Sequence, residues 1–177
     1  MDRPRLFHVS EEPGIARFVP RPPPSPDSGV TGEAVWAVAE SHLVNFLTPR
    51  DCPRIGFRAG PATSETDRAR FLGDVERVLA IEAAWLARLE AGVVFLYEMP
   101  PKTFEVALPE AGYWISRQAV TPRAVRAEPD LVAAIARAGA ELRVVEDFWP
   151  LADAVAASTL EFSIIRKRNA APRGPQP

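Results

Sequence analysis

The stretch Leu6-Phe7-His8-Val9-Ser10 is the starting point for both the fold and the site. It is a short, mostly apolar run that predicts a β-strand, and residues 11–14, Glu-Glu-Pro-Gly, predict a turn directly after it. The run also holds His8, one of only two histidines in the chain. The other, His42, follows a second strand-like segment at residues 35–39, so these two segments are where chemistry is expected first.

Further short strands are predicted from β-branched and aromatic runs. They lie at residues 33–39, 93–99, 104–108, 113–116, 120–125 and 141–145. Because helical segments interrupt the strands without regular alternation, the pattern predicts an α+β fold rather than a doubly wound parallel sheet. No G-x-G-x-x-G or G-x-x-x-x-G-K-[ST] sequence is present, so a Rossmann or P-loop nucleotide site has no support.

A long inserted helix is predicted at about residues 65–91. Ser64 and Asp67 have the spacing of a capping box, and Gly92 stands where a left-handed C-terminal cap belongs. The apolar residues between them keep helical spacing: Phe71, Val75, Val78, Leu79, Leu86 and Leu89. A helix followed directly by a strand predicts packing of the helix on a sheet.

C-terminal helices are predicted at residues 130–137 and 151–168, the second being one helix or two. With 177 residues, 47% of them apolar, the chain has the size and composition of one globular domain with a single core. We therefore assign residues 1–170 to one domain. The proline-rich end, residues 171–177, is predicted to be a disordered tail.

Charge and cysteine content restrict the function classes. The formal net charge is −2, so an RNA partner would need a local basic patch. The single cysteine, Cys52, excludes an internal disulfide, and two histidines are too few for a typical zinc site, so no metal site is expected. Without a secretory signal or an apolar run near the ~20 residues of a membrane span, we expect a cytoplasmic protein without membrane contact.

A proline-rich loop follows the first predicted strands, with most of its prolines at residues 20–26. Proline has no backbone N–H, so this segment predicts an exposed, polyproline-like loop. It is either a plain connection or a binding segment for an SH3-type partner, and the sequence leaves that choice open.

Three segments together resemble the ADP-ribosyltransferase superfamily. Residues 6–10 resemble its "Leu-Tyr-His-Gly-Ser/Thr" opening strand, and residues 35–38, Val-Trp-Ala-Val, resemble the strand of its second motif. Residues 112–116, Gly-Tyr-Trp-Ile-Ser, resemble its third motif. Together with Val-Thr-Pro at residues 120–122, this last segment is most similar to the RNA 2'-phosphotransferase branch, which has a "Gly-Val-Trp-Leu-Thr" strand and a "Val-Pro-Pro" turn.

The resemblance implies a split β-sheet core and a site that takes NAD as its substrate. His8 would hold the adenosine ribose, and Ser10 would contact the nicotinamide side. The residues assigned to the nucleotide are His8, Ser10, Trp36, Trp114 and Ser116, and those assigned to catalysis are His8, His42 and Arg50. The chemistry mainly requires orientation of the ribose and stabilisation of an oxocarbenium-like centre. The implied function is binding of NAD or ADP-ribose, with transfer of ADP-ribose to an RNA phosphate or another acceptor.

Other polar residues have two interpretations each. Arg50 and Arg54 flank a proline-stiffened loop, where they would face phosphates of NAD or RNA or would simply be solvated. Residues 166–168, Arg-Lys-Arg, either complement a helix dipole or contact RNA. Cys52 would need a neighbouring base to be a nucleophile and is better explained as a small buried residue.

One departure from the superfamily pattern concerns its third-motif glutamate, because residues 112–114 here are Gly-Tyr-Trp. Glu98 and Glu105 are the nearest substitutes for that carboxylate. The alternative is therefore a non-catalytic ligand- or protein-binding member of the same fold with a degenerate active site. In that case His8 is structural and Trp36 packs in the core, and whether the protein is an enzyme stays open.

Overall fold

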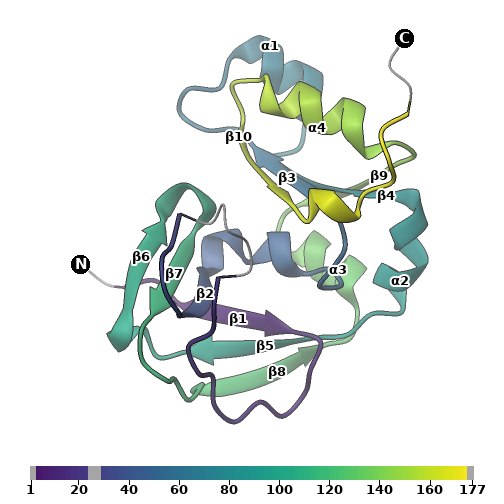
Figure 1. Ribbon diagram of the computed structural model, residues 1–177. Helices are drawn as coiled ribbons and strands as arrows, with labels where there is room; N and C mark the ends of the chain where they lie inside the picture. Colours follow the sequence, from purple (N-terminus) through teal and green to yellow (C-terminus); the bar gives the residue numbers. More distant parts are fainter. Residues whose placement is uncertain (1–2, 24–28, 175–177) are drawn as a thin grey trace. The chain divides into compact units, whose positions relative to one another are not determined.

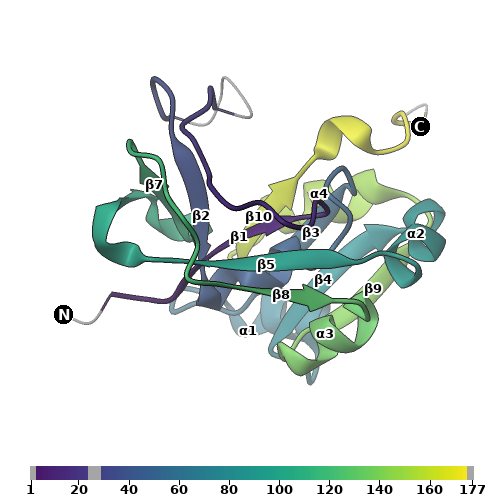
Figure 2. The same ribbon diagram turned by 90° about the horizontal axis from the view of Figure 1, so that it is seen from below.

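The computed structural model describes residues 3–23 and 29–174, which belong to two compact units (Figures 1 and 2). The first unit comprises Met1–Phe46 and Val93–Glu128, and the second comprises Leu47–Gly92 and Pro129–Pro177. Each unit has its own sheet and its own cluster of buried apolar side chains. The predicted α+β class is confirmed, but the single core expected from the chain length is divided between two sheets.

The first unit is a six-stranded sheet in the order β6-β7-β2-β1-β5-β8, with every neighbouring pair antiparallel. Its strands are β1 (Leu6–Ser10), β2 (Val35–Ala39), β5 (Val94–Met99), β6 (Phe104–Leu108), β7 (Tyr113–Ser116) and β8 (Ala124–Glu128). Short 3-10 helices follow three of these strands: η2 (Glu40–Phe46), η5 (Pro101–Thr103) and η6 (Pro109–Ala111). Strands that are distant in the sequence, such as β1 and β5, are therefore neighbours (Figure 2).

One face of this sheet, called the core face below, holds the buried cluster of the first unit. Its members are Leu6, Phe18, Val35, Ala37, Ala39, Tyr97, Met99, Phe104 and Val120. Phe18 and Val120 come from outside the strands and exchange two backbone hydrogen bonds of 2.8 Å. Because Val120 pairs with Phe18, the predicted strand at residues 120–125 is displaced, and β8 begins only at Ala124.

The second unit is a four-stranded sheet in the order β10-β3-β4-β9, in which β4 and β9 are parallel. Its strands are β3 (Arg54–Arg58), β4 (Arg77–Glu82), β9 (Glu141–Val145) and β10 (Glu161–Ile165). Its α-helices are α1 (Glu65–Asp67), α2 (Leu86–Glu90), α3 (Leu131–Arg137) and α4 (Phe148–Ala156). Phe57 of β3 and Phe148 of α4 belong to one buried cluster, so α4 covers that face of the sheet (Figure 1).

The predicted long helix at residues 65–91 is wrong in its middle part: residues 65–72 and 83–90 are helical, but β4 separates them, and Gly92 does not have the predicted left-handed conformation. Ser64 Oγ does accept a hydrogen bond of 3.2 Å from Asp67 N, and helical turns continue to Leu72. Gly73, at φ +57°, then ends them, and the chain enters β4. Residues 78–81 are all 0% exposed, so β4 is covered on both faces as well as paired along both edges. Its continuous apolar run happens to fit helical spacing, which misled the prediction.

The predicted C-terminal helices are correct at α3 but wrong for residues 157–168. Asp147 Oδ1 accepts a hydrogen bond from Trp149 N, which starts α4 three residues before the predicted position. Ser158 does not start a second helix, because its hydroxyl donates to Val155 O at 2.7 Å and marks the end of α4. Residues 161–165 then pair with β3 as an edge strand.

The C-terminal segment makes defined contacts up to Arg173, within the predicted disordered tail. Ala171 N donates to both carboxylate oxygens of Glu82, at 3.1 and 3.2 Å. Arg173 forms two hydrogen bonds with Asp153 and lies over the ring of Trp149, 4.1 Å from its centroid. Residues 175–177 lie outside the described part of the chain.

The proline-rich loop is described only in part, because residues 24–28 lie outside the described ranges. At its start Arg21 exchanges two backbone hydrogen bonds with Ala34, of 3.1 and 2.9 Å, so the loop leaves from and returns to the same place. In the described ranges, no helix has the length and apolar character needed to span a bilayer.

Candidate functional site at the opening between β1 and β2

The sheet of the first unit opens between β1 and β2 at His8. All five residues of β1 pair with β5, whereas only Leu6 and Phe7 pair with β2. At His8, where the next backbone pair between β1 and β2 would form, a side chain of β1 contacts the backbone of β2 instead. Its Nδ1 lies 2.8 Å from the carbonyl oxygen of Trp36 on β2. The histidine that the sequence analysis selected therefore bridges the two separating strands.

This contact defines the protonation of the His8 ring. A carbonyl oxygen only accepts hydrogen bonds, so Nδ1 must carry the proton and donate it to Trp36 O. In the neutral ring, Nε2 is then the hydrogen-bond acceptor. The ring is held in place by Phe18, whose centroid lies 4.6 Å from that of the imidazole. His8 is therefore an oriented acceptor at the opening of the sheet.

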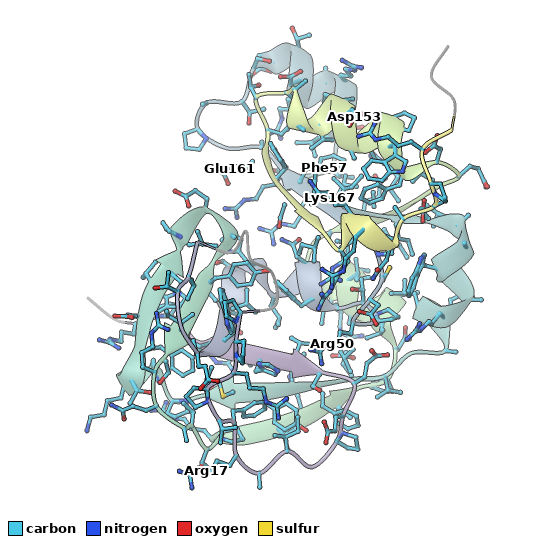
Figure 3. The ribbon with its side chains drawn as sticks, viewed as in Figure 1. Arg17, Arg50, Phe57, Asp153, Glu161 and Lys167 are labelled. Carbon is cyan, nitrogen blue, oxygen red and sulfur yellow. The ribbon has the colours of Figure 1, made fainter. Side chains whose placement is uncertain are left out.

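Phe18 belongs to a segment, residues 11–19, that crosses the core face and is called the strap below. The fully buried Tyr97 of β5 ties it down, because the Tyr97 hydroxyl donates to Glu12 O at 2.7 Å and accepts from Ile15 N at 3.1 Å. The rings of Tyr97 and Phe18 also pack edge to face, with their centroids 5.2 Å apart. On the same strap, Arg17 is exposed (Figure 3). The sequence analysis missed Phe18 and Tyr97 because only strand pairing brings them beside His8.

The register shows which of the other predicted nucleotide contacts share a face with His8. Ala37 pairs with Trp114, and His8 stands at the position of β1 that would pair with Ala37, so the three form one row across the core face. The small Ala37 lies between the two rings. Ser10 is on the same face, and its Oγ accepts a hydrogen bond of 3.1 Å from Glu12 N.

Trp36 and Ser116 are placed differently from these residues. Trp36 projects from the opposite face of the sheet. Its ring packs edge to face with the ring of Tyr113, with the two centroids 5.6 Å apart. Within the described residues, its buried indole Nε1 has no hydrogen-bond partner. Ser116 is on the core face but is 0% exposed, and its hydroxyl donates to Thr103 Oγ1 at 2.9 Å. The structure therefore groups His8, Ser10 and Trp114 but not these two.

The two remaining predicted catalytic residues lie on other elements, His42 in the first unit and Arg50 in the second. His42 lies on η2, where its Nδ1 is 2.9 Å from Ser41 Oγ. Its ring fills the space that a side chain at position 112 would need. Gly112 also has φ +68°, so both the space and the backbone conformation require glycine there. Arg50 belongs to the second unit (Figure 3), where its carbonyl accepts hydrogen bonds of 3.3 Å from Arg54 and Arg166.

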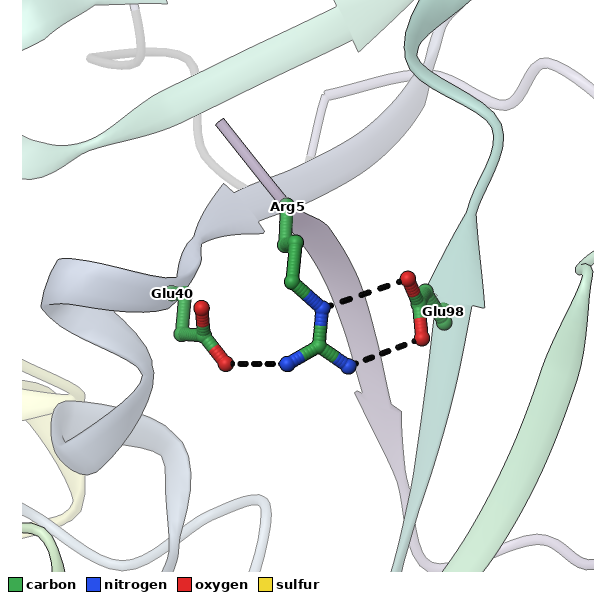
Figure 4. Close-up of polar contacts among 3 residues, drawn as sticks. All are labelled: Arg5, Glu40 and Glu98. Carbon is green, nitrogen blue, oxygen red and sulfur yellow. Dashed lines mark hydrogen bonds and ion pairs between the residues drawn. The ribbon is translucent and has the colours of Figure 1, made fainter. Parts of the chain in front are cut away.

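Glu98, the nearest substitute for a catalytic carboxylate, is held by Arg5 (Figure 4). Arg5 donates to both oxygens of Glu98, at 3.3 and 2.9 Å, and to Glu40 at 2.6 Å. The hydrogen bonds from Arg5 hold the pKa of Glu98 below its ordinary value. Glu98 therefore stays ionised at neutral pH and does not serve as a proton donor there. The other substitute, Glu105 of β6, is exposed.

Cys52 is the small buried residue favoured by the sequence analysis. It is 0% exposed, and burial raises the pKa of its thiol to about 12. Its Sγ lies 3.5 Å from the carbonyl oxygen of Pro53. A thiol with so high a pKa supplies almost no thiolate at neutral pH, so Cys52 is not a nucleophile in the folded protein.

At pH 8 we expect Cys52 to react with iodoacetamide at least about 10³-fold more slowly in the folded protein than in urea, since its pKa rises from 9.0 to about 12. Mass spectrometry of the alkylated peptide measures both rates. Above pH 9.0 the unfolded thiol ionises while the folded one stays protonated, so this group lowers stability as the pH rises to about 12. Equal labelling rates in buffer and in urea would contradict the burial.

Comparison with known proteins gives a family but no described activity. Residues 7–170 match a family described as "Family of unknown function (DUF6886)". No curated protein and no solved structure matches the chain. Within the described residues, there is also no group of three or more His, Cys, Asp or Glu side chains that would hold a metal ion.

Proposed function

The chain belongs to the DUF6886 family of unknown function, and we propose that its first unit binds NAD or ADP-ribose where β1 and β2 separate. The observation that carries this proposal is the contact between His8 Nδ1 and Trp36 O. It leaves Nε2 as the acceptor in the neutral ring, and a ribose hydroxyl is a suitable donor for it. The bond to Trp36 fixes the ring before a ligand arrives, which lowers the entropic cost of binding.

The arrangement of the strands supports an ADP-ribosyltransferase-like split sheet. The three segments that resemble the superfamily are far apart in the sequence, yet they are the adjacent strands β1, β2 and β7. In this proposal the opening between β1 and β2 is the split of that sheet. Trp114 and Phe18 on the core face supply aromatic surface for a nicotinamide or adenine ring. Ser10 supplies a polar contact beside them.

A transfer reaction at this site would break the bond between ribose C1' and nicotinamide. Nicotinamide would leave with the bonding electron pair, and an oxygen of the acceptor, such as an RNA phosphate, would form the new bond to C1'. His8 would contribute by orienting the ribose rather than by moving a proton. The main requirement of this chemistry is a set of hydrogen bonds that orient the ribose while positive charge develops at its C1'.

The ion pair at Glu98 favours a second candidate, a non-catalytic member that binds the nucleotide without transfer. Glu98 is occupied by Arg5, and Glu105 is exposed on an edge strand. Neither is arranged as the activating carboxylate that the glutamate-dependent transferases use. The two candidates share the same nucleotide site and differ in whether nicotinamide is released.

Millimolar NAD or ADP-ribose is expected to raise the Tm of the wild-type protein by about 2 °C or more. His8→Ala should weaken binding about tenfold, since one oriented hydrogen bond is lost. His42→Ala, the matched control, should bind as wild type does. Scanning fluorimetry and isothermal titration calorimetry measure both effects, with circular dichroism to check folding of each variant.

Two measurements distinguish the enzyme from the non-catalytic member and test the His8 site. Release of nicotinamide from NAD, followed by chromatography, would establish the enzyme, whereas binding without release would establish the non-catalytic member. Absence of a Tm shift in the wild type, or an equal loss in both histidine variants, would refute the His8 site.

A further inference from the structure

The second unit binds three residues near its C-terminal end, Ala171, Pro172 and Arg173, which are called the tail segment below. All three are exposed, and they belong to no helix or strand. Their contacts are nevertheless specific. Ala171 N donates to both carboxylate oxygens of Glu82, and Ala171 O accepts a hydrogen bond of 2.7 Å from Trp149 Nε1. The backbone of Ala171 is therefore bound through its N–H and its C=O at once.

Arg173 is bound by an aromatic ring and a carboxylate of α4. Its guanidinium lies 4.1 Å from the centroid of the Trp149 ring and donates to both oxygens of Asp153, at 2.6 and 2.9 Å (Figure 3 labels Asp153). Trp149 and Asp153 are four residues apart, so they are neighbours on one side of the helix. A planar guanidinium suits both partners, whereas a lysine ammonium forms no such fork. The contact therefore favours arginine.

Glu82 connects the tail segment to a buried charge. It is the last residue of β4 and is only 4% exposed, so its carboxylate is largely shielded from water. Both hydrogen bonds that this carboxylate accepts from the described residues come from Ala171 N. A buried carboxylate without a donor is unfavourable. A backbone N–H, from the tail segment or from another segment in its place, is therefore required at Glu82.

The tail segment can be exchanged without opening the core of the second unit. The side chains of Arg173 and Asp153 are 45% and 54% exposed, and an ion pair so accessible to water contributes little to stability. Ala171 and Pro172 are exposed as well. Another segment that offers the same groups can therefore take the place of the tail segment.

We propose that Glu82, Trp149 and Asp153, called the arginine-recognition surface below, bind an arginine-containing segment of a partner protein, which replaces the tail segment. The contacts define the chemistry of that segment: a residue bound through its backbone N–H and C=O, and an arginine two positions later. Proline between them keeps the segment out of a helix. The two carboxylates of the surface complement its positive charge. This surface lies within the second unit, and the proposal does not depend on the nucleotide site at His8.

The test uses a fluorescein-labelled peptide with the sequence of residues 169–174, Asn-Ala-Ala-Pro-Arg-Gly, and the full-length chain. Arg173→Ala loosens the tail segment, so fluorescence anisotropy should show peptide binding with a Kd below about 1 mM. Wild type should bind the peptide at least about fivefold more weakly, because the tethered tail segment competes at a local concentration in the millimolar range. Equal affinity of the two proteins, or no binding to Arg173→Ala, would overturn the proposal.

Two controls assign the binding to the arginine-recognition surface. Adding Asp153→Asn to Arg173→Ala should abolish binding, whereas adding Asp74→Asn, at an exposed carboxylate of the same unit, should leave it unchanged. A peptide with lysine in place of its arginine should bind at least about fivefold more weakly. Circular dichroism checks the folding of each variant. Binding that survives Asp153→Asn, or equal binding of the lysine peptide to Arg173→Ala, would refute recognition of arginine at this surface.

Discussion

Replacing Tyr97 with alanine is expected to lower the free energy of unfolding of the first unit by about 3–5 kcal/mol, the range for removing a buried aromatic side chain. Tyr97 is 0% exposed and belongs to the buried cluster with Phe18 and Leu6. Its removal also leaves Glu12 O and Ile15 N without their hydroxyl partner. The strap should then detach from the core face. Urea unfolding followed by circular dichroism measures the loss.

The matched control is Tyr97→Phe, which keeps the ring and removes only the hydroxyl. We expect it to cost about 1–2 kcal/mol, because two hydrogen bonds are lost while the packing remains. Limited proteolysis of the strap should increase in both variants and more in the alanine variant. A Tyr97→Ala protein within about 1 kcal/mol of wild type would contradict the role of Tyr97 as an anchor.

Replacing Phe57 with alanine is expected to have a similarly large effect on the second unit, about 3–5 kcal/mol. Phe57 is 2% exposed and packs against Phe71 edge-on, with ring centroids 6.3 Å apart. The sheet supplies a control at the same register position. Phe162 pairs directly with Phe57 but lies on the edge strand and is 44% exposed.

Phe162→Ala should therefore cost less than about 1 kcal/mol of unfolding free energy, since 44% of Phe162 is already exposed to water. Chemical unfolding of the two variants under identical conditions gives the comparison. If the two units unfold in separate transitions, Phe57→Ala should shift one transition and Tyr97→Ala the other. Equal losses of unfolding free energy in Phe57→Ala and Phe162→Ala would contradict the placement of Phe57 in the core and of Phe162 on the exposed edge strand.

The strands could largely be predicted from local composition. Residues 6–10, 35–39, 94–99, 104–108, 113–116 and 141–145 all lie within or close to predicted segments. Each is short, β-branched or aromatic, and bounded by turn residues. The failures were at residues 77–82 and 161–165, where strands were taken for helix, and at residues 54–58, where no strand was predicted. A fully buried strand and a buried helix both present apolar runs, and only the neighbouring strands distinguish them.

The candidate site shows a similar division. His8 was found because histidine is rare in this chain and stands in a strand-like run. Its partners Trp36 O and Phe18 could not be found, because one is a backbone atom and the other lies on a strap defined only by its contact with Tyr97. The separation of Trp36 from Trp114 onto opposite faces follows from the register of β2 with β7. Register depends on pairing across the sheet and not on local sequence.

The sequence by itself determined the class of the fold and most of its strands, and it selected His8 as a candidate site residue, because these follow from residue types and short-range spacing. Only the tertiary structure decided the division into two sheets and the opening between β1 and β2. These features arise from contacts between segments distant along the chain, and such pairings are chosen by the burial of whole sheet faces.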